Sequence, residues 1–122
     1  LAPELIIYWG LGEKARVGGH PEPGLWIHGA NETLLKLSAS GILASDLNAC
    51  NIYTDAAAMA KKVKCPTQFV LGRNDQMTPL KKGQALAEMV NDSHVVVIER
   101  SGHMMMAERP NQIYDALKGF VF

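Results

Sequence analysis

The chain has 122 residues, about the length of one small domain, and 48% of them are hydrophobic. Lys and Arg total 12 and Asp and Glu total 12, so the formal net charge is zero. This balance does not give the basic surface that binds nucleic acid or an anionic membrane, and the composition differs from that of a disordered chain.

The longer apolar runs are too short for a membrane helix. Leu5–Trp9 and Val95–Ile98 each span only a few residues, whereas a bilayer needs roughly 20. Cys50 and Cys65 lie in no metal-binding or redox spacing, which favours a reducing, cytoplasmic location. The chain begins at Leu1 without an initiator Met, so we expect it to be a piece of a longer protein.

Residues 1–63 predict short helices joined by loops, because no run there has the alternation or β-branching typical of a strand. Three apolar residues share one side of the helix expected over residues 3–10: Leu5, Ile6 and Trp9. Many Gly and Pro residues predict an irregular loop from there to about residue 29, and Asn31 is expected to cap the next helix.

Residues 64–122 follow a different pattern. Thr67–Leu71 and Val95–Ile98 are short apolar runs typical of buried parallel strands. Between them, Thr78 as N-cap and Pro79 at the first helical position predict a crossover helix. Five apolar residues predict an amphipathic helix at the end of the chain: Ile113, Tyr114, Leu117, Phe120 and Val121.

This order of strand, helix, strand and helix predicts two parallel strands. Since parallel sheets are buried on both faces, two strands are too few for a complete sheet. We therefore expect further strands from an upstream segment of the same protein or from a second copy of the chain.

Asp75 and His103 each follow one of these strands, four residues after Leu71 and five after Ile98. The carboxyl ends of parallel strands meet at one edge of a sheet, which would bring the carboxylate and the imidazole together. Such a carboxylate fixes the imidazole tautomer and stabilises the imidazolium when the ring accepts a proton. A nucleophile is then needed, but no G-x-S-x-G elbow occurs in the chain, so we expect it outside these 122 residues.

Several motifs in this half occur in a particular succession. Pro66-Thr67 leads into the first strand, Gly72-Arg73-Asn74-Asp75 runs on to Thr78-Pro79, and Gly102-His103 is followed by Glu108-Arg109-Pro110. This succession resembles the C-terminal part of the α/β-hydrolases. The resemblance implies an α/β fold, with residues 1–63 as a helical cap or lid and residues 64–122 as the last β-α-β-α unit of the core.

By this resemblance Asp75 is the acid and His103 the general base of a catalytic triad. The implied function is hydrolysis of a small-molecule carboxylic ester, thioester or lactone by an upstream Ser, without a cofactor. Two alternatives stay open. One is an upstream Asp nucleophile, as in epoxide hydrolases and haloalkane dehalogenases, and the other is a non-catalytic ligand-binding or association module. The 122-residue chain alone is expected to be inactive.

Other candidate residues have both functional and structural interpretations. Met77, Met104 and Trp26 are candidates for lining an apolar substrate pocket, although Met and Trp are also common packing residues. Glu108 is expected either to orient the loop that holds His103 or to begin the last helix. The histidines show no metal-ligand spacing, so we expect no metal site.

Overall fold

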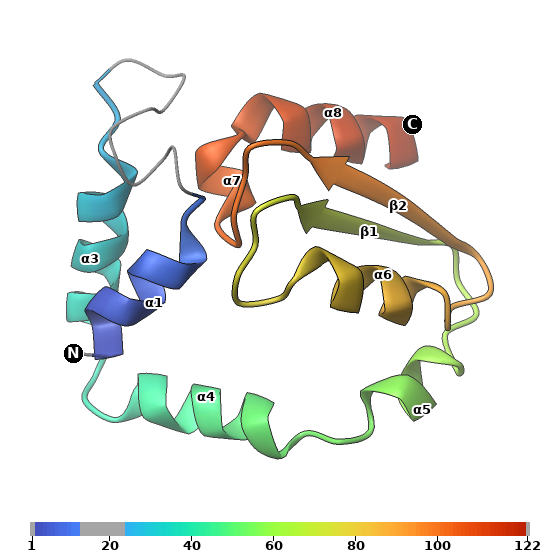
Figure 1. The fold of residues 1–122 in the computed structure, drawn as a ribbon, viewed down its shortest axis with the longest axis horizontal. Helices are drawn as coiled ribbons and strands as arrows, with labels where there is room; N and C mark the ends of the chain where they lie inside the picture. Colours follow the sequence, from blue (N-terminus) through green and yellow to red (C-terminus); the bar gives the residue numbers. More distant parts are fainter. Residues whose placement is uncertain (1, 13–23, 122) are drawn as a thin grey trace.

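The computed structural model describes residues 2–12 and 24–121, in which four helices precede a β-α-β unit and two further helices (Figure 1). The part of the expected irregular loop that covers residues 13–23 lies outside the described residues. The elements in chain order are α1 (Ala2–Gly10), α3 (Ile27–Leu37), α4 (Ile42–Ile52), α5 (Ala56–Ala60), β1 (Thr67–Gly72), α6 (Leu80–Ala87), β2 (Ser93–Ile98), α7 (Met105–Glu108) and α8 (Pro110–Val121).

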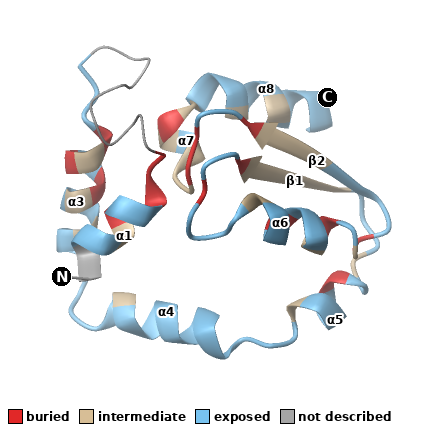
Figure 2. Cartoon of the chain, viewed as in Figure 1, coloured by how far each residue is buried: buried red, intermediate tan, exposed pale blue. Residues whose placement is uncertain are grey.

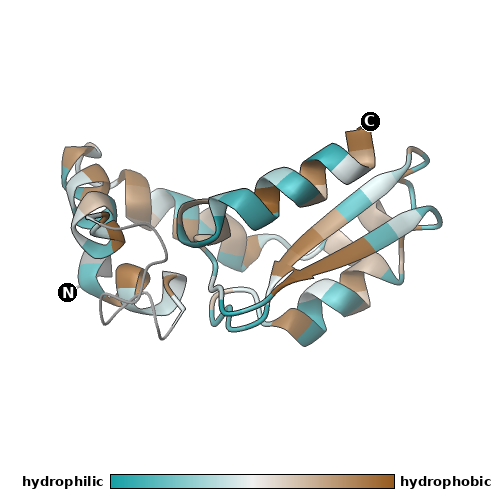
Figure 3. Ribbon diagram, turned by 90° about the horizontal axis from the view of Figure 1, so that it is seen from above, coloured by the Kyte–Doolittle hydropathy of each residue, from teal (hydrophilic) through white to brown (hydrophobic). Residues whose placement is uncertain are grey.

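The two strands pair in parallel, as the sequence predicts. Their register aligns Thr67 with Ser93 and Gly72 with Ile98, so both strands end at the same edge. Helices α6 and α8 lie on opposite sides of this small sheet, and the strands are rich in hydrophobic residues (Figure 3). The C-terminal half is therefore an α/β arrangement with its loops after β1 and β2 side by side.

The first helix forms where expected but buries a different face. Ile7 and Leu11 are 3% and 0% exposed and form a core cluster with Ile27 of α3. Leu5 and Trp9, two of the apolar residues that share the other side of the helix, are exposed. Positions 7 and 11, four residues apart, face α3, and only this tertiary contact selects their stripe for burial.

Two predicted helix caps, Asn31 and Thr78, are wrong. Helix α3 begins at Ile27 and the Ala30 N–H already donates to the Trp26 carbonyl, so Asn31 lies inside the helix and is buried. Helix α6 follows Pro79, one residue later than expected, and Thr78 does not cap it. The Thr78 backbone N–H donates to the Asp75 carboxylate, so Thr78 belongs to the loop before the helix.

Helix α8 has the predicted apolar stripe, but most of that stripe is exposed. The exposed fractions are 63% at Tyr114, 50% at Leu117, 43% at Phe120 and 65% at Val121, and no residue of the helix is buried. Helix α4 likewise buries none of its residues. No helix among the described residues is both long and apolar enough to span a membrane.

Many of the buried residues lie at the carboxyl ends of the strands. Figure 2 shows buried residues in the loops after β1 and β2, at the end of α1, on α3 and in α7, and others on α5 and α6. The N-terminal helices α1 and α3 therefore pack beside the loops that carry the candidate site.

Candidate active site

The loops after β1 and β2 are held together by their backbones. The Arg73 N–H donates to the Ile98 carbonyl (3.0 Å) and the Asn74 N–H donates to the Ser101 carbonyl (2.8 Å). Gly72 allows this approach, because a Cβ there would lie 2.9 Å from the Ser101 carbonyl oxygen. These contacts bring the segments that carry Asp75 and His103 to one place.

Asp75 has a carboxylate whose two oxygens have separate partners. Oδ1 accepts hydrogen bonds from the backbone N–H groups of Met77 and Thr78, both at 2.8 Å. Oδ2 lies 2.9 Å from Nδ1 of His103, and only 4% of the Asp75 side chain is exposed. The loop thus fixes the carboxylate on one side and leaves its other oxygen for the imidazole.

His103 has an imidazole that is buried on the Asp75 side and open on the other. Its side chain is 40% exposed. Since an ionised carboxylate can only accept, neutral His103 donates from Nδ1 to Asp75. This tautomer leaves Nε2 with a lone pair, which is the nitrogen able to take a proton from a nucleophile.

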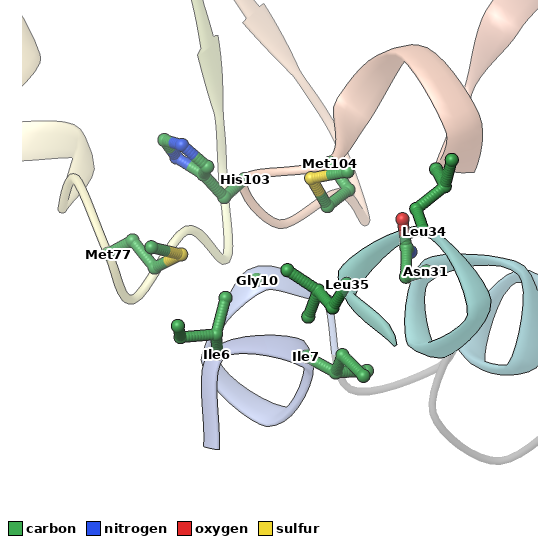
Figure 4. Close-up of a pocket in the computed structure, with 9 residues that line it drawn as sticks. All are labelled: Ile6, Ile7, Gly10, Asn31, Leu34, Leu35, Met77, His103 and Met104. Atoms are coloured by element: carbon green, nitrogen blue, oxygen red, sulfur yellow. The ribbon is translucent and has the colours of Figure 1, made fainter. Parts of the chain in front are cut away.

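An apolar pocket of about 170 Å³ lies beside His103 (Figure 4). It lies where α1, α3 and the loops after β1 and β2 meet. Its lining residues are Ile6, Ile7, Gly10, Asn31, Leu34, Leu35, Met77, His103 and Met104. Two of the candidate substrate residues, Met77 and Met104, therefore lie on the same pocket as His103. Asn31 is the one amide in this lining, and its buried Nδ2 has no hydrogen-bond partner among the described residues.

Trp26 is the candidate that the structure separates from this pocket. Its side chain is 67% exposed, and its ring stacks on that of His28 with centroids 6.2 Å apart. The same ring lies against Gly29, where a Cβ would collide with it. Trp26 thus packs on its own helix and does not line the pocket beside His103.

Glu108 is fully buried, an unusual position for a carboxylate. Oε1 accepts from the Gly102 N–H and Oε2 from the Gly12 N–H, both at 2.9 Å. Burial raises the pKa of the Glu108 carboxyl above its ordinary value, and the two N–H donors only partly offset that effect. The sequence left two roles open for Glu108, a contact with the loop of His103 or the start of the last helix. The bond from Gly102 is a contact with that loop. Glu108 is the last residue of α7 and turns back from α8.

The described residues contain no cluster of side chains that could hold a metal ion. No three His, Cys, Asp or Glu side chains gather to hold an ion within residues 2–12 and 24–121. Cys50 and Cys65 are free and exposed, and Ser101 is fully buried with its hydroxyl directed at the Gly102 carbonyl. The Asp75–His103 contact thus has the geometry of a carboxylate–imidazole pair that can transfer a proton.

The parallel β-α-β unit and its flanking helices identify the chain as the C-terminal part of an α/β-hydrolase. A family model described as "Serine hydrolase (FSH1)" matches residues 23–112, and the chain belongs to this family.

A named lipase is similar to about half of the chain, and two solved enzyme structures are similar to nearly all of it. Monoacylglycerol lipase ABHD6 from Mus musculus is 33% identical over 60 residues, which are 49% of this chain and 18% of the lipase. An esterase from Thermogutta terrifontis has the same fold over 98% of this chain and 42% of its own, with a TM-score of 0.82 and 24% identity. Est816, described as an N-acyl homoserine lactone degrading enzyme, matches 97% of this chain and 46% of its own, with a TM-score of 0.74 and 19% identity. The chain thus spans less than a fifth of the lipase and less than half of each enzyme structure.

Proposed function

We propose that this chain supplies the acid and the general base of a Ser-His-Asp hydrolase whose serine lies upstream of Leu1. The observation that carries the proposal is the 2.9 Å contact between His103 Nδ1 and an Asp75 carboxylate that backbone N–H groups hold from the other side. Membership of a serine hydrolase family supports Ser over Asp as the nucleophile.

The proposed reaction proceeds through an acyl-enzyme. The serine oxygen adds to the carbonyl carbon of the substrate while His103 Nε2 takes its proton, and Asp75 stabilises the imidazolium. Collapse of the tetrahedral intermediate expels the alcohol, thiol or lactone oxygen, which receives that proton from His103. Water then attacks the acyl-enzyme with His103 again as base, which releases the acid and restores the serine.

The proposed substrate is a carboxylic ester, thioester or lactone with an apolar group on one side of the scissile bond. The pocket beside His103 supports this, because Met77 and Met104 line it together with aliphatic residues of α1 and α3. The names of two similar proteins, a monoacylglycerol lipase and an N-acyl homoserine lactone degrading enzyme, support the same substrate class. We assign the helices of residues 1–63 to a lid over that pocket.

We also propose that an upstream segment, or failing that a second copy of the chain, completes the sheet. Both outer edges of the β1–β2 pair lack a strand partner among the described residues. The apolar stripe of α8 is exposed, which further supports a missing packing partner. Light scattering on the 122-residue chain would test this, since a compact and cooperatively folded monomer would contradict it.

The decisive experiment is to express the chain with its upstream coding region and treat it with a fluorophosphonate, which phosphonylates an activated serine and releases fluoride. We expect mass spectrometry to find the label on a serine outside residues 1–122. The label should be lost in His103→Gln and retained in His94→Gln, a matched change at an exposed histidine. Absence of labelling, or labelling that survives His103→Gln, would reject the serine mechanism.

A second preparation, residues 1–122 without the upstream region, tests the inactivity that we assign to the isolated chain. Without a nucleophile and an oxyanion-binding loop, residues 1–122 alone should hydrolyse a short p-nitrophenyl ester no faster than the His103→Gln variant. Turnover by the mass-verified 122-residue chain that depends on His103 would show that the nucleophile lies within it.

A further inference from the structure

Glu108 forms a bridge between two backbone segments that are far apart in sequence. Its Oε2 accepts from Gly12, 96 positions away, and its Oε1 accepts from Gly102, six positions away. Gly12 follows α1, and Gly102 directly precedes His103. A side chain that is 0% exposed thus joins the pocket-lining helix to the loop that carries the candidate base.

The glycines at this bridge allow a contact that side chains would prevent. A Cβ on Gly12 would lie 2.8 Å from Glu108 Oε2 and 3.0 Å from the Gly102 nitrogen. A Cβ on Gly102 would lie 2.7 Å from the Leu11 carbonyl carbon and 2.8 Å from the Gly10 oxygen. Because these neighbours of Gly102 are backbone atoms, they cannot move aside as a flexible side chain would. The bridge therefore has a defined geometry.

His103 is restrained on both sides by this crossing of segments. The N–H of Gly102 before it donates to Glu108, and the N–H of Met104 after it donates to the Gly10 carbonyl at 2.9 Å. The His103 backbone is thereby placed against α1 while its ring contacts Asp75. Both carboxylate oxygens of Glu108 accept from backbone N–H groups, so Glu108 acts on the position of His103 through the backbone.

We propose that Glu108 is a positioning residue for His103. Its carboxylate holds the Gly12 and Gly102 N–H groups together and so keeps the imidazole at hydrogen-bonding distance from Asp75. Each of the two N–H donors has its own carboxylate oxygen as acceptor, Oε2 for Gly12 and Oε1 for Gly102. A Gln side chain offers one acceptor and would turn its NH₂ group toward the other N–H. The proposal rests on His103 being the proposed base, but the positioning can be measured without any turnover.

The test measures the tautomer of His103 by ¹⁵N NMR in the full-length protein with labelled histidines, at about pH 8. The His103 signals are assigned by their loss in His103→Gln. The wild type should be mainly the Nδ1–H form, and in Glu108→Gln that form should fall to a minority while the protein stays folded. Glu99→Gln, the same change at an exposed carboxylate of the preceding turn, should leave the tautomer unchanged.

Gly12→Ala is a second variant that disturbs the bridge while the carboxylate remains, and it decides the question if Glu108→Gln does not fold. We expect it to lower the Nδ1–H fraction as well. A folded Glu108→Gln protein with a lower melting temperature and the wild-type tautomer would overturn the proposal, because Glu108 would then only stabilise the fold. If the full-length protein hydrolyses no ester, the proposed function fails, but the tautomer measurement still decides this inference.

Discussion

Replacing Asp75 by Asn tests the geometry of the site most directly, because the change keeps the size of the side chain and alters only its hydrogen bonding. Asp75 Oδ1 accepts from Met77 and Thr78, and Oδ2 accepts from His103. An Asn has one acceptor oxygen, which should stay with the two backbone donors. Its NH₂ group then faces Nδ1 of His103, which must become an acceptor, so the ring should change to the Nε2–H tautomer.

The expected loss of stability follows from the two backbone contacts. A hydrogen bond to a charged acceptor contributes about 1.5–3 kcal/mol and a neutral one about 0.5–1.5 kcal/mol. Each of the two bonds should therefore weaken by about 1 kcal/mol, and the free energy of unfolding should fall by about 2 kcal/mol. In a competent full-length hydrolase the wrong tautomer should also lower kcat by about 10⁴-fold, as an Asp-to-Asn change does in another serine triad.

Urea unfolding at neutral pH measures the stability, and the ¹⁵N shifts of the His103 ring measure the tautomer. Asp115→Asn on the exposed surface of α8 is the control and should change neither quantity. If Asp75→Asn kept the Nδ1–H form and the wild-type stability, the Asp75–His103 contact would not determine the state of the ring, and the assignment of Asp75 as the acid would be refuted.

Three further predictions concern the core, the pocket and the buried carboxylate. Leu11→Ala should lower the free energy of unfolding by about 3 kcal/mol, because Leu11 is 0% exposed, whereas Leu37→Ala, at 77% exposure, should change it by less than about 0.5 kcal/mol in the same urea titration. Asn31→Leu should raise the melting temperature by removing a buried and unpartnered amide worth about 1 kcal/mol, and a lower melting temperature would show that the amide has a partner. Burial raises the pKa of Glu108 in the folded state, so that state binds its proton more tightly than the unfolded state does. The free energy of unfolding, measured relative to Glu108→Gln, should therefore fall as the pH rises from about 4.5 through the folded-state pKa, and a flat or rising difference would contradict this.

Much of the C-terminal half could be predicted because its signals are local. The apolar runs stopped by Gly72 and Glu99 specify two strands, and the helix between them requires those strands to be parallel. That topology brings together the residues that follow each strand. The 28-residue separation of Asp75 and His103 thus becomes a 2.9 Å contact.

Helix positions in the N-terminal half were less predictable, because tertiary contacts decide them. Nothing local distinguishes Ile7 from Leu5 as the core residue of α1, and only the packing of Ile7 and Leu11 against Ile27 does so. Asn31 has the composition of a cap, but it lies inside α3, which begins four residues earlier. In such short helices the burial of a face outweighs the preference of a single capping residue.

The sequence by itself determined the α/β class, the order of the last strands and helices, and the meeting of Asp75 with His103, since each depends on apolar patterns and on the residues next to them. The tertiary structure alone decided that Met77 and Met104 share a pocket with His103 while Trp26 does not. It also decided that Glu108 joins Gly12 to Gly102. No periodicity marks a side chain whose partners are backbone N–H groups, one of them 96 residues away, because every residue except proline has such a donor.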